Sequence, residues 1–339
     1  MPNVSKHILV IRLSAMGDVA MTVPVLRALL QQYPEVRITV LTRAFFGPFF
    51  RDLPNVKVFP AEVKGKHKGV FGLYKLSKEL KNLGIDAIAD LHNVLRSNIL
   101  KVLLSAIPCI QIYKGRAEKK ALITGKKFTK LKTTHQRYAD VFEALGYKLD
   151  VSNPIFPEKK VLNEKLKTFL GKGSKKHIGI APFAAHEGKM YPLDVMKTVV
   201  KTLSKAYNIV LFGGGEKEIQ ILNDLEYSFT NVINIAGKLT LDEELDVISN
   251  LDVMLSMDSG NAHIAAMLGV KVITIWGVTH PFAGFAPFNQ PDDYMLLTDR
   301  EQFPLIPTSV YGNIYPEHYK EASRSISPET IIEKIRFLV

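Results

Sequence analysis

The stretch HILVIRLSAMGDVAMTVPVLRALLQQY, residues 7–33, decides the fold class. An apolar, strand-like segment (7–12) leads directly into a segment with helical spacing (20–33). Gly17 and Asp18 stand at the junction, and Asp18 is the only acid in the stretch. A strand that passes through a glycine turn into a helix is the typical opening of a parallel α/β sheet.

The alternation of apolar strands and amphipathic helices continues through the first half of the chain. The further expected strands are 36–41, 55–59, 85–90 and 108–112. The segments with helical spacing between them are 72–83, 95–104 and 135–146. This β-α-β order predicts a parallel sheet with helices on both faces.

A polar segment, GYKLDVSNPIFPEKK (146–160), interrupts the pattern, which then begins again. The expected strands of the second set are 177–181, 208–212, 231–235, 252–256 and 271–275. The expected helices are 194–205, 216–227, 242–250, 259–268 and 328–338. We therefore predict an α/β protein with two doubly wound parallel-sheet units. Ligands bind beyond the carboxyl ends of such strands, so two units facing each other would form a cleft.

Composition excludes several classes of protein. The 339 residues are 47% hydrophobic and 23% charged, as in ordinary globular proteins. Cys109 is the only cysteine, which excludes an internal disulfide and a cysteine-based zinc site. The N-terminal apolar run is too short for a signal peptide. The longest uncharged run, 272–291, is broken by prolines and glycines and predicts a strand and loop. We expect a cytoplasmic protein without a membrane span.

The formal net charge is +11, and much of the excess lies in residues 114–137, which hold nine Lys or Arg against one Glu. The segment is either a solvated surface loop or a patch for an anionic substrate or membrane surface. It lacks the interleaved aromatics that would favour nucleic acid.

Two roles are open for Asp18, a helix cap and a general base. A carboxylate in the first turn of a helix is favoured by the helix dipole, and a capping role is common for a lone Asp. At the carboxyl end of a strand, the same side chain could project toward a ligand and act as a general base.

Three later motifs also follow expected strands. FGGGEKEIQ (212–220) could bring the backbone close to a nucleotide, with Glu216 accepting from ribose hydroxyls. SMDSGNAHIAAMLG (256–269) opens a helix whose N–H groups could hold a diphosphate. APFAAHEGKMYP (181–192) carries Lys189, a possible phosphate partner. The structural alternatives are a tight strand-to-helix turn for 212–220, a structural role for His263, and a surface lysine for Lys189.

Other chemistries lack their motifs. The chain has no Walker A spacing, no H-E-x-x-H and no G-x-S-x-G. No D-x-D stands between apolar strands, so we expect no metal at a diphosphate site. The glycine fingerprint of nicotinamide dehydrogenases is absent as well.

Two segments, IRLSAMGDVAMTVPVLRAL and SMDSGNAHIAAMLGVKVITIWG, resemble the bacterial heptosyltransferase family, glycosyltransferase family 9. The resemblance rests on the elements G-D-x5-P and D-[ST]-G-x2-H, and it covers nearly the whole chain. It implies a GT-B fold with an acceptor-binding domain (1–160), a donor-binding domain (161–325) and a terminal helix (326–339) that crosses back to the first domain. It also implies inverting, metal-independent transfer of heptose from ADP-heptose to the lipopolysaccharide core.

The resemblance assigns roles to individual residues. Asp18 matches the catalytic base. The donor-binding residues would be Lys189, Glu216, Leu239, Asp258, Ser259, Gly260 and His263. The acceptor-binding residues would be Gly17, His92, Asn93, Arg96 and Ser97.

The chain departs from the family pattern in two places. DLHNVLRSN (90–98) keeps Arg96 and Ser97, but His92 and Asn93 replace the usual pair. Ala184 and Ala185 stand where inner-core enzymes carry two threonines. The alternatives are another GT-B activity, such as a nucleotide-sugar epimerase, and a nucleotide-sugar-binding protein without turnover. Neither the sugar, the acceptor nor the oligomeric state can be read from the sequence.

Overall fold

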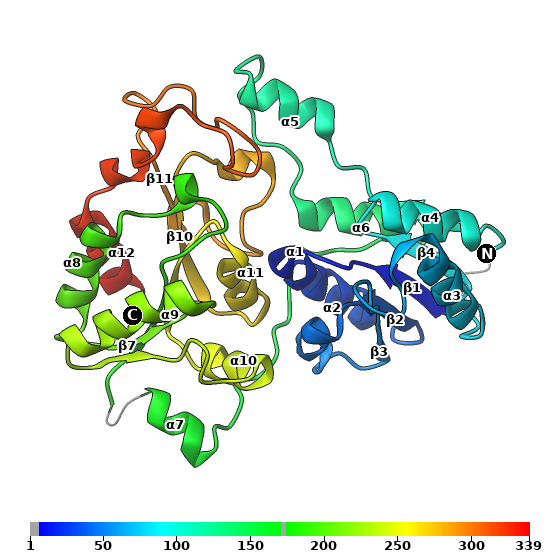
Figure 1. The fold of residues 1–339 in the computed structure, drawn as a ribbon, viewed down its shortest axis with the longest axis horizontal. Helices are drawn as coiled ribbons and strands as arrows, with labels where there is room; N and C mark the ends of the chain where they lie inside the picture. The colour runs from blue at the N-terminus through cyan, green and yellow to red at the C-terminus, as the bar shows by residue number, and fades with distance from the viewer. Residues whose placement is uncertain (1–6, 171–173) are drawn as a thin grey trace. The chain divides into compact units, whose positions relative to one another are not determined.

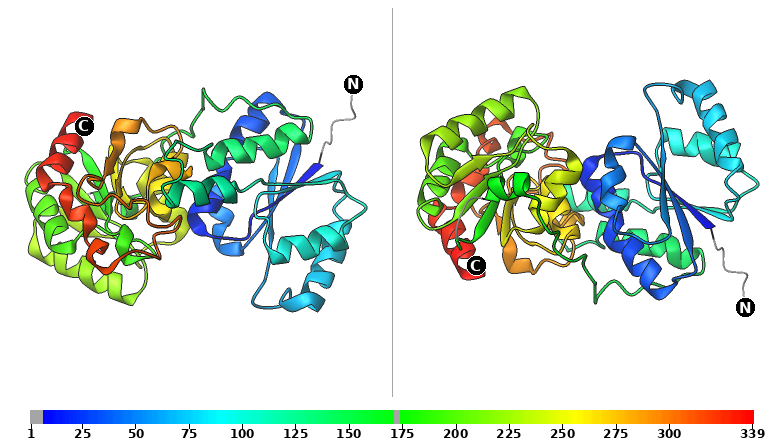
Figure 2. Two further views of the ribbon diagram at one scale, coloured as in Figure 1. Left: turned by 90° about the horizontal axis from the view of Figure 1, so that it is seen from above. Right: turned by 90° about the horizontal axis from the view of Figure 1, so that it is seen from below.

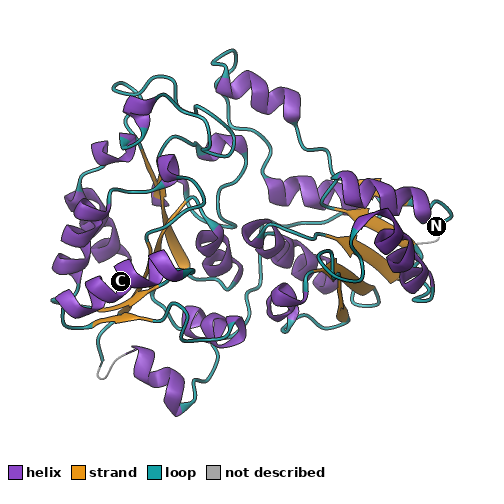
Figure 3. Ribbon diagram, in the orientation of Figure 1, coloured by secondary structure: helices purple, strands orange, loops and turns teal. Residues whose placement is uncertain are grey.

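In the computed structural model, residues 7–11 form a buried strand, β1 (His7–Ile11), at the centre of a parallel sheet. The structure describes residues 7–170 and 174–339. The chain forms two units, one of residues 1–114 with 134–155 and one of residues 115–133 with 156–339. Each unit has its own sheet flanked by helices (Figures 1 and 3).

The first sheet has the strand order β3-β2-β1-β4-β5, and all its pairs are parallel. The bounds of its strands are β1 (His7–Ile11), β2 (Arg37–Thr42), β3 (Val56–Pro60), β4 (Ala87–Asp90) and β5 (Cys109–Gln111). The helices of this unit are α1 (Met16–Ala20), α2 (Thr22–Gln32), α3 (Gly69–Lys81), α4 (Leu95–Leu103) and α6 (Thr134–Ala144).

Side chains of β1 alternate between the two faces of this sheet. Every residue of the strand is buried, because both faces are covered. Leu9 and Ile11 pack in one cluster with Leu73 and Leu76 of α3 and Leu100 of α4. Helices cover both faces (Figure 2). A continuously apolar strand is what a doubly covered parallel sheet requires.

The second sheet has the order β11-β10-β9-β6-β7-β8, also all parallel. Its strands are β6 (His177–Ala181), β7 (Asn208–Leu211), β8 (Val232–Asn234), β9 (Val253–Met257), β10 (Lys271–Trp276) and β11 (Met295–Leu297). The helices of this unit are α5 (Arg116–Ile123), α7 (Glu164–Leu170), α8 (Leu193–Leu203), α9 (Glu216–Ser228), α10 (Leu241–Ser249), α11 (Gly260–Met267) and α12 (Pro328–Leu338).

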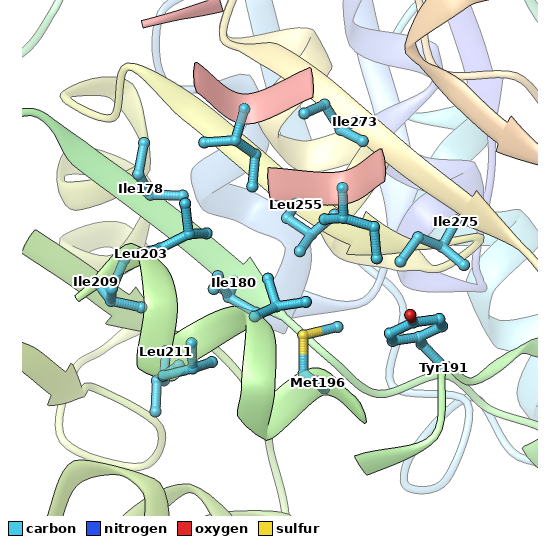
Figure 4. Close-up of a cluster of buried hydrophobic side chains, with 14 of the residues drawn as sticks. Ile178, Ile180, Tyr191, Met196, Leu203, Ile209, Leu211, Leu255, Ile273 and Ile275 are labelled. Atoms are coloured by element: carbon cyan, nitrogen blue, oxygen red, sulfur yellow. The ribbon is translucent and has the colours of Figure 1, made fainter. Parts of the chain in front are cut away.

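One apolar cluster fills the space between this sheet and helices α8, α9 and α12 (Figure 4). Ile180 and Leu255 from the sheet meet Met196 of α8 and Ile331 and Ile335 of α12 in it. Helix α12 is therefore part of the core of the second unit.

The observed units differ from the expected division in two respects. Residues 115–133 belong to the second unit, although they lie between two segments of the first. The terminal segment expected at 326–339 forms α12 and packs within the second unit. Helices α5 and α7 and strand β11 were not expected from the periodicity. Within the described residues, no helix is long and apolar enough to cross a membrane.

Candidate functional site

Each sheet has one topological switch point, a pair of neighbouring strands from which the chain adds further strands toward opposite edges of the sheet. In the first sheet it lies between β1 and β4, and in the second between β6 and β9. Open α/β sheets bind ligands beyond the carboxyl ends of the strands at such a point. Asp18 follows β1 and His92 follows β4, while Lys189 follows β6 and Asp258 follows β9. These four predicted residues thus lie at the switch point of their own unit.

Asp18 is fixed by two neighbours. It lies in the first turn of α1, where its Oδ2 accepts from the N–H of Ala15 at 3.3 Å. The same oxygen lies 2.5 Å from Nη2 of Arg12, and the Asp18 side chain remains 29% exposed. The capping interpretation is therefore correct as local geometry, and it leaves a carboxylate that solvent or a ligand can reach.

Arg12 was not predicted to take part in the site. Its Nη1 donates to the carbonyl of Leu91 at 2.7 Å, so its guanidinium links the turn after β1 to the turn after β4. Burial alone would lower the pKa of Arg12, but Tyr138 and Asp18 outweigh burial and raise it. The buried Tyr138 hydroxyl donates to the carbonyl oxygen of Asp18 at 3.3 Å. A permanent positive charge is thus held against Asp18.

Asp90, at the end of β4, organises the neighbouring turn. Its Oδ1 accepts from the backbone N–H of His92 at 2.9 Å and of Asn93 at 2.8 Å. Its Oδ2 accepts from Gln111 at 2.8 Å. The Nδ1 of His92 accepts from the N–H of Leu13 at 3.4 Å, which again joins the two turns. Asp90 is fully buried and was not among the predicted residues.

His92 provides a pH-dependent test of this arrangement. Burial and the charge of Arg12 lower the pKa of His92 to about 4, although Asp90 opposes them. As the pH is lowered from about 6.5 to 4, the unfolded chain takes up a proton at this histidine and the folded chain does not. The free energy of unfolding therefore decreases as the pH decreases. We expect the free energy of unfolding to decrease by about 1–3 kcal/mol less between pH 7 and pH 5 in His92→Gln than in the wild type, as measured by urea unfolding at the two pH values.

The control is His186→Gln, which changes an exposed histidine and should leave the wild-type pH dependence unchanged. An unchanged pH dependence in His92→Gln would show that His92 is not held neutral in the folded protein.

The other predicted acceptor residues lie near this turn. Gly17 precedes Asp18 in α1 and is half-buried. Arg96 is exposed in the first turn of α4. Ser97 is buried, and its hydroxyl bonds the backbone of Val94 at the start of the same helix, at 2.9 and 3.0 Å. The structure thus gives Ser97 a role in capping α4, and its role with an acceptor stays a prediction.

Lys189 is not the lone cation that the sequence suggested. It ends a short 3-10 helix, Glu187–Lys189, and its Nζ lies 2.8 Å from Oδ2 of Asp258. The same carboxylate oxygen accepts from the hydroxyl of Thr279 at 2.8 Å. The Asp258 and Lys189 side chains are only 8% and 14% exposed. Thr279, which follows β10, was missed because nothing in its own segment indicates a polar site.

Two glycines, Gly277 and Gly312, allow neighbouring segments to pack closely on the Lys189 loop. A Cβ on Gly277 would lie 2.2 Å from the carbonyl oxygen of Gly188, the acceptor of a 2.8 Å bond from the N–H of Val278. A Cβ on Gly312, where φ is +74°, would lie 2.4 Å from the Cγ of Lys189. The aliphatic stem of Lys189 is thus packed against backbone, which limits where its ammonium group can point.

The motif after β9 forms the start of α11, as expected. Ser259 is the N-cap residue, and its Oγ lies 3.1 Å from Oγ of Ser256 instead of bonding the helix start. Gly260 is the first helical residue, and His263 is buried one turn further on. The positive end of the helix dipole therefore lies next to the Lys189–Asp258 pair.

Glu216 and Leu239 lie along the same edge of the second sheet, after β7 and β8. Glu216 is exposed at the start of α9, and the Gly214 N–H is bonded to Glu218 at 2.8 Å. Leu239 is half-buried in the loop before α10. This loop packs on α9, because a Cβ on Gly237 would lie 2.9 Å from Ile219.

The basic segment is attached to the second unit by an aromatic cluster. The Phe128 ring packs at a tilt against Phe282 and edge to face against His280, each with centroids 5.1 Å apart, and Arg300 lies 3.6 Å above the Phe128 ring. The N–H of Leu131 donates to the carbonyl of Phe282 at 3.0 Å. This part of the segment is therefore an ordered, packed structure rather than a loose surface loop.

The comparisons with known proteins agree with these motifs. A model of glycosyltransferase family 9 (heptosyltransferase) matches residues 73–305. The chain is 27% identical over 297 residues to the lipopolysaccharide core heptosyltransferase OpsX of Haemophilus influenzae, covering 85% of this chain and 83% of that one. It is 22% identical to lipooligosaccharide heptosyltransferase 2 of Campylobacter jejuni, covering 95% of this chain and 96% of that one.

Solved structures share the fold. A family 9 glycosyltransferase from Veillonella parvula has a TM-score of 0.76 at 21% identity, covering 98% of this chain and 97% of that one. E. coli heptosyltransferase WaaC with ADP has a TM-score of 0.70 at 18% identity, covering 98% of this chain and 100% of that one. The predicted GT-B fold, with two Rossmann-like α/β domains, is confirmed.

Proposed function

Because the chain belongs to glycosyltransferase family 9, we propose that it transfers a heptose from ADP-heptose to the lipopolysaccharide core or a similar glycolipid, with inversion and without a metal ion. The supporting observation is that both family motifs lie at a switch point. The first places Asp18 beside Arg12, and the second places Asp258 beside Lys189. The first motif supplies a partly exposed carboxylate, and the second supplies an ammonium group next to a helix start, which we propose as the site of the donor diphosphate.

The proposed reaction is a single displacement. The acceptor hydroxyl oxygen attacks the anomeric carbon of the donor and forms the new C–O bond. The bond from that carbon to the diphosphate oxygen breaks, and the electron pair leaves with ADP. Asp18 takes the proton of the attacking hydroxyl as general base. Arg12 holds the Asp18 carboxylate in one position, so the group is oriented before the acceptor binds.

The second unit would bind the donor. The ammonium group of Lys189 has donors left besides its bond to Asp258, and the start of α11 adds N–H groups near Ser259 and Gly260. Both would stabilise the charge that develops on the departing diphosphate. In this proposal Glu216 accepts from the ribose hydroxyls and Leu239 packs on the adenine. Asp258 and His263 help to form the diphosphate site.

Ala184 and Ala185 bear on how the diphosphate is held. Ala184 is half-buried and packs against the apolar core of the unit, and Ala185 is exposed. Neither supplies the hydroxyl donor expected from the family pattern. In this proposal the Lys189 ammonium and the α11 N–H groups supply the donors in their place.

The acceptor would lie at the turns after β1 and β4, near Gly17, His92, Asn93, Arg96 and Ser97. Relatives are named as lipopolysaccharide and lipooligosaccharide heptosyltransferases, which supports a glycolipid acceptor of this class. We expect the reaction to take place at the cytoplasmic face of the inner membrane.

The test begins with thermal unfolding in the presence of ADP, UDP or GDP. A ligand at about 100 times its Kd stabilises the folded protein by about 2.7 kcal/mol, so ADP should raise Tm clearly more than UDP or GDP. ADP-heptose is then incubated with and without a truncated lipopolysaccharide acceptor, and the products are identified by mass spectrometry.

We expect transfer only when the acceptor is present. Conversion of the donor alone would support an epimerase instead. ADP binding with no transfer to any acceptor would support a binding protein without turnover. Equal stabilisation by all three nucleotides would contradict the ADP-linked donor.

A further inference from the structure

The first two turns of α3 display apolar side chains to solvent. Phe71 is 91% exposed, Val70 63% and Tyr74 50%. They lie on one side of the helix, because the opposite side, with Leu73, buries its apolar residues in the core of the first unit. Exposed apolar side chains that lie next to one another and are surrounded by polar residues are a feature of interaction sites.

The same stretch carries a dense positive charge. Six exposed lysines stand between residues 64 and 81, and Glu79 is the only acid in that range. The lysines are Lys64, Lys66, Lys68, Lys75, Lys78 and Lys81. Lys66 lies 3.5 Å from both Glu79 and the preceding Glu62, which leaves the other five lysines to carry the excess charge. Lys78 lies 4.7 Å above the ring of Tyr74. We call these lysines together with Val70, Phe71 and Tyr74 the α3 surface.

The backbone that presents the α3 surface is firmly held. The buried His67 accepts from the N–H of Glu62 at 3.0 Å, and its Nε2 lies 3.4 Å from Glu79 of α3. A Cβ on Gly72 would lie 2.3 Å from the backbone of His67, so glycine is required for the loop to pack against the helix. The apolar side chains are therefore displayed by an ordered turn.

We propose that the α3 surface docks on an anionic lipid bilayer. Val70, Phe71 and Tyr74 enter the boundary between headgroups and acyl chains, while the lysines contact acidic headgroups above it. The positive charge decides against a second copy of this chain, because two such surfaces would bring lysine against lysine. The reason for docking rests on the proposed function, since an enzyme that acts on a lipid-linked acceptor must reach it at the membrane surface.

This surface differs from the basic segment that the sequence pointed to. Residues 115–133 are all described, and none of their large apolar side chains is strongly exposed. Phe128 is engaged with Phe282 and Arg300, and Lys130 with Asp292 at 2.7 Å. The segment has charge without apolar anchors, whereas the α3 surface has both.

The test measures cosedimentation of the full chain with vesicles of phosphatidylcholine alone or mixed with phosphatidylglycerol. Phe71→Ser should lower the partition coefficient on the mixed vesicles about tenfold. Tyr227→Ser is the matched control, because Tyr227 is an equally exposed aromatic, 94% exposed, on α9 of the second unit. We expect it to bind as the wild type does. Val70→Ser gives a second, independent variant.

The charge component is tested separately. Lys64→Gln with Lys68→Gln should weaken binding to mixed vesicles about tenfold or more, and added salt should remove the difference. Lys126→Gln with Lys127→Gln removes two exposed charges from the other basic segment and should have a smaller effect.

The outcomes separate this proposal from the proposed function. Wild-type protein that does not sediment with mixed vesicles, or a Phe71→Ser variant that sediments like wild type, overturns the docking proposal. A concentration-dependent dimer lost in Phe71→Ser, or capture of another protein in place of vesicles, overturns it too. Transfer to a water-soluble acceptor should be unchanged in Phe71→Ser. If transfer is absent in every variant while vesicle binding depends on Phe71, the docking stands and the transferase function fails.

Discussion

Replacing Asp18 with asparagine should lower the rate of heptose transfer by about 10²–10⁴-fold. Asparagine has nearly the same shape, and its amide oxygen can still accept from the N–H of Ala15 and from Arg12. It cannot take the proton of the acceptor hydroxyl. The change therefore removes the general base while keeping the local cap, and kcat should fall with little change in the binding of ADP.

The measurements are initial rates with saturating donor and acceptor, Tm, and the rise in Tm with ADP. Glu143→Gln on α6 is the matched control, since it also replaces an acid of the first unit by its amide but at an exposed position. It should keep wild-type activity. If Asp18→Asn turns over at the wild-type rate, Asp18 is a helix cap and the mechanism is wrong.

Lys189→Met should reduce kcat/KM by about 10²–10³-fold. Methionine keeps the aliphatic stem that packs on Gly312 but removes the ammonium group proposed to meet the donor diphosphate. The change also leaves Asp258 buried with Thr279 but without its cation. Such an uncompensated carboxylate should lower the free energy of unfolding by about 1–3 kcal/mol.

A double variant separates the two effects. Lys189→Met with Asp258→Asn restores local charge balance, so stability should recover while activity and ADP binding stay low. Lys320→Met is the control, because Lys320 forms a 2.9 Å ion pair with Glu187 at an exposed position of the same unit. Its stability and activity should stay close to those of the wild type, because an exposed ion pair contributes little. Full recovery of activity in the double variant would show that Lys189 serves only to neutralise Asp258.

Much of the fold could be predicted from the sequence because the strands are short apolar runs between amphipathic helices. Ten strands were expected, and each is present with its ends shifted by at most two residues. The elements that were missed have weak patterns. Leu122 is the only buried residue of α5, and β11 has three residues at the edge of its sheet.

The site was predictable only in part. Asp18, Lys189 and Asp258 follow strands and carry charge, so their positions could be expected. Their partners could not, because a pairing such as Lys189 with Asp258 joins residues 69 positions apart in the chain. Arg12 did leave a signal, since it is a buried charge at the end of an apolar strand, where an uncompensated cation would be costly.

The path of the chain has a practical consequence for dissecting the protein. The chain enters the second unit at Gly115, returns to the first at Thr134 and leaves it again after Ile155. A fragment that stops at residue 155 would carry 115–133 without Phe282 and Arg300, and would expose Phe128 to water. A fragment that starts at residue 156 would lack the piece that covers those side chains. To fold as it does in the full chain, the second unit would need residues 115–133 joined to its fragment. The first unit would need a short linker in place of those residues.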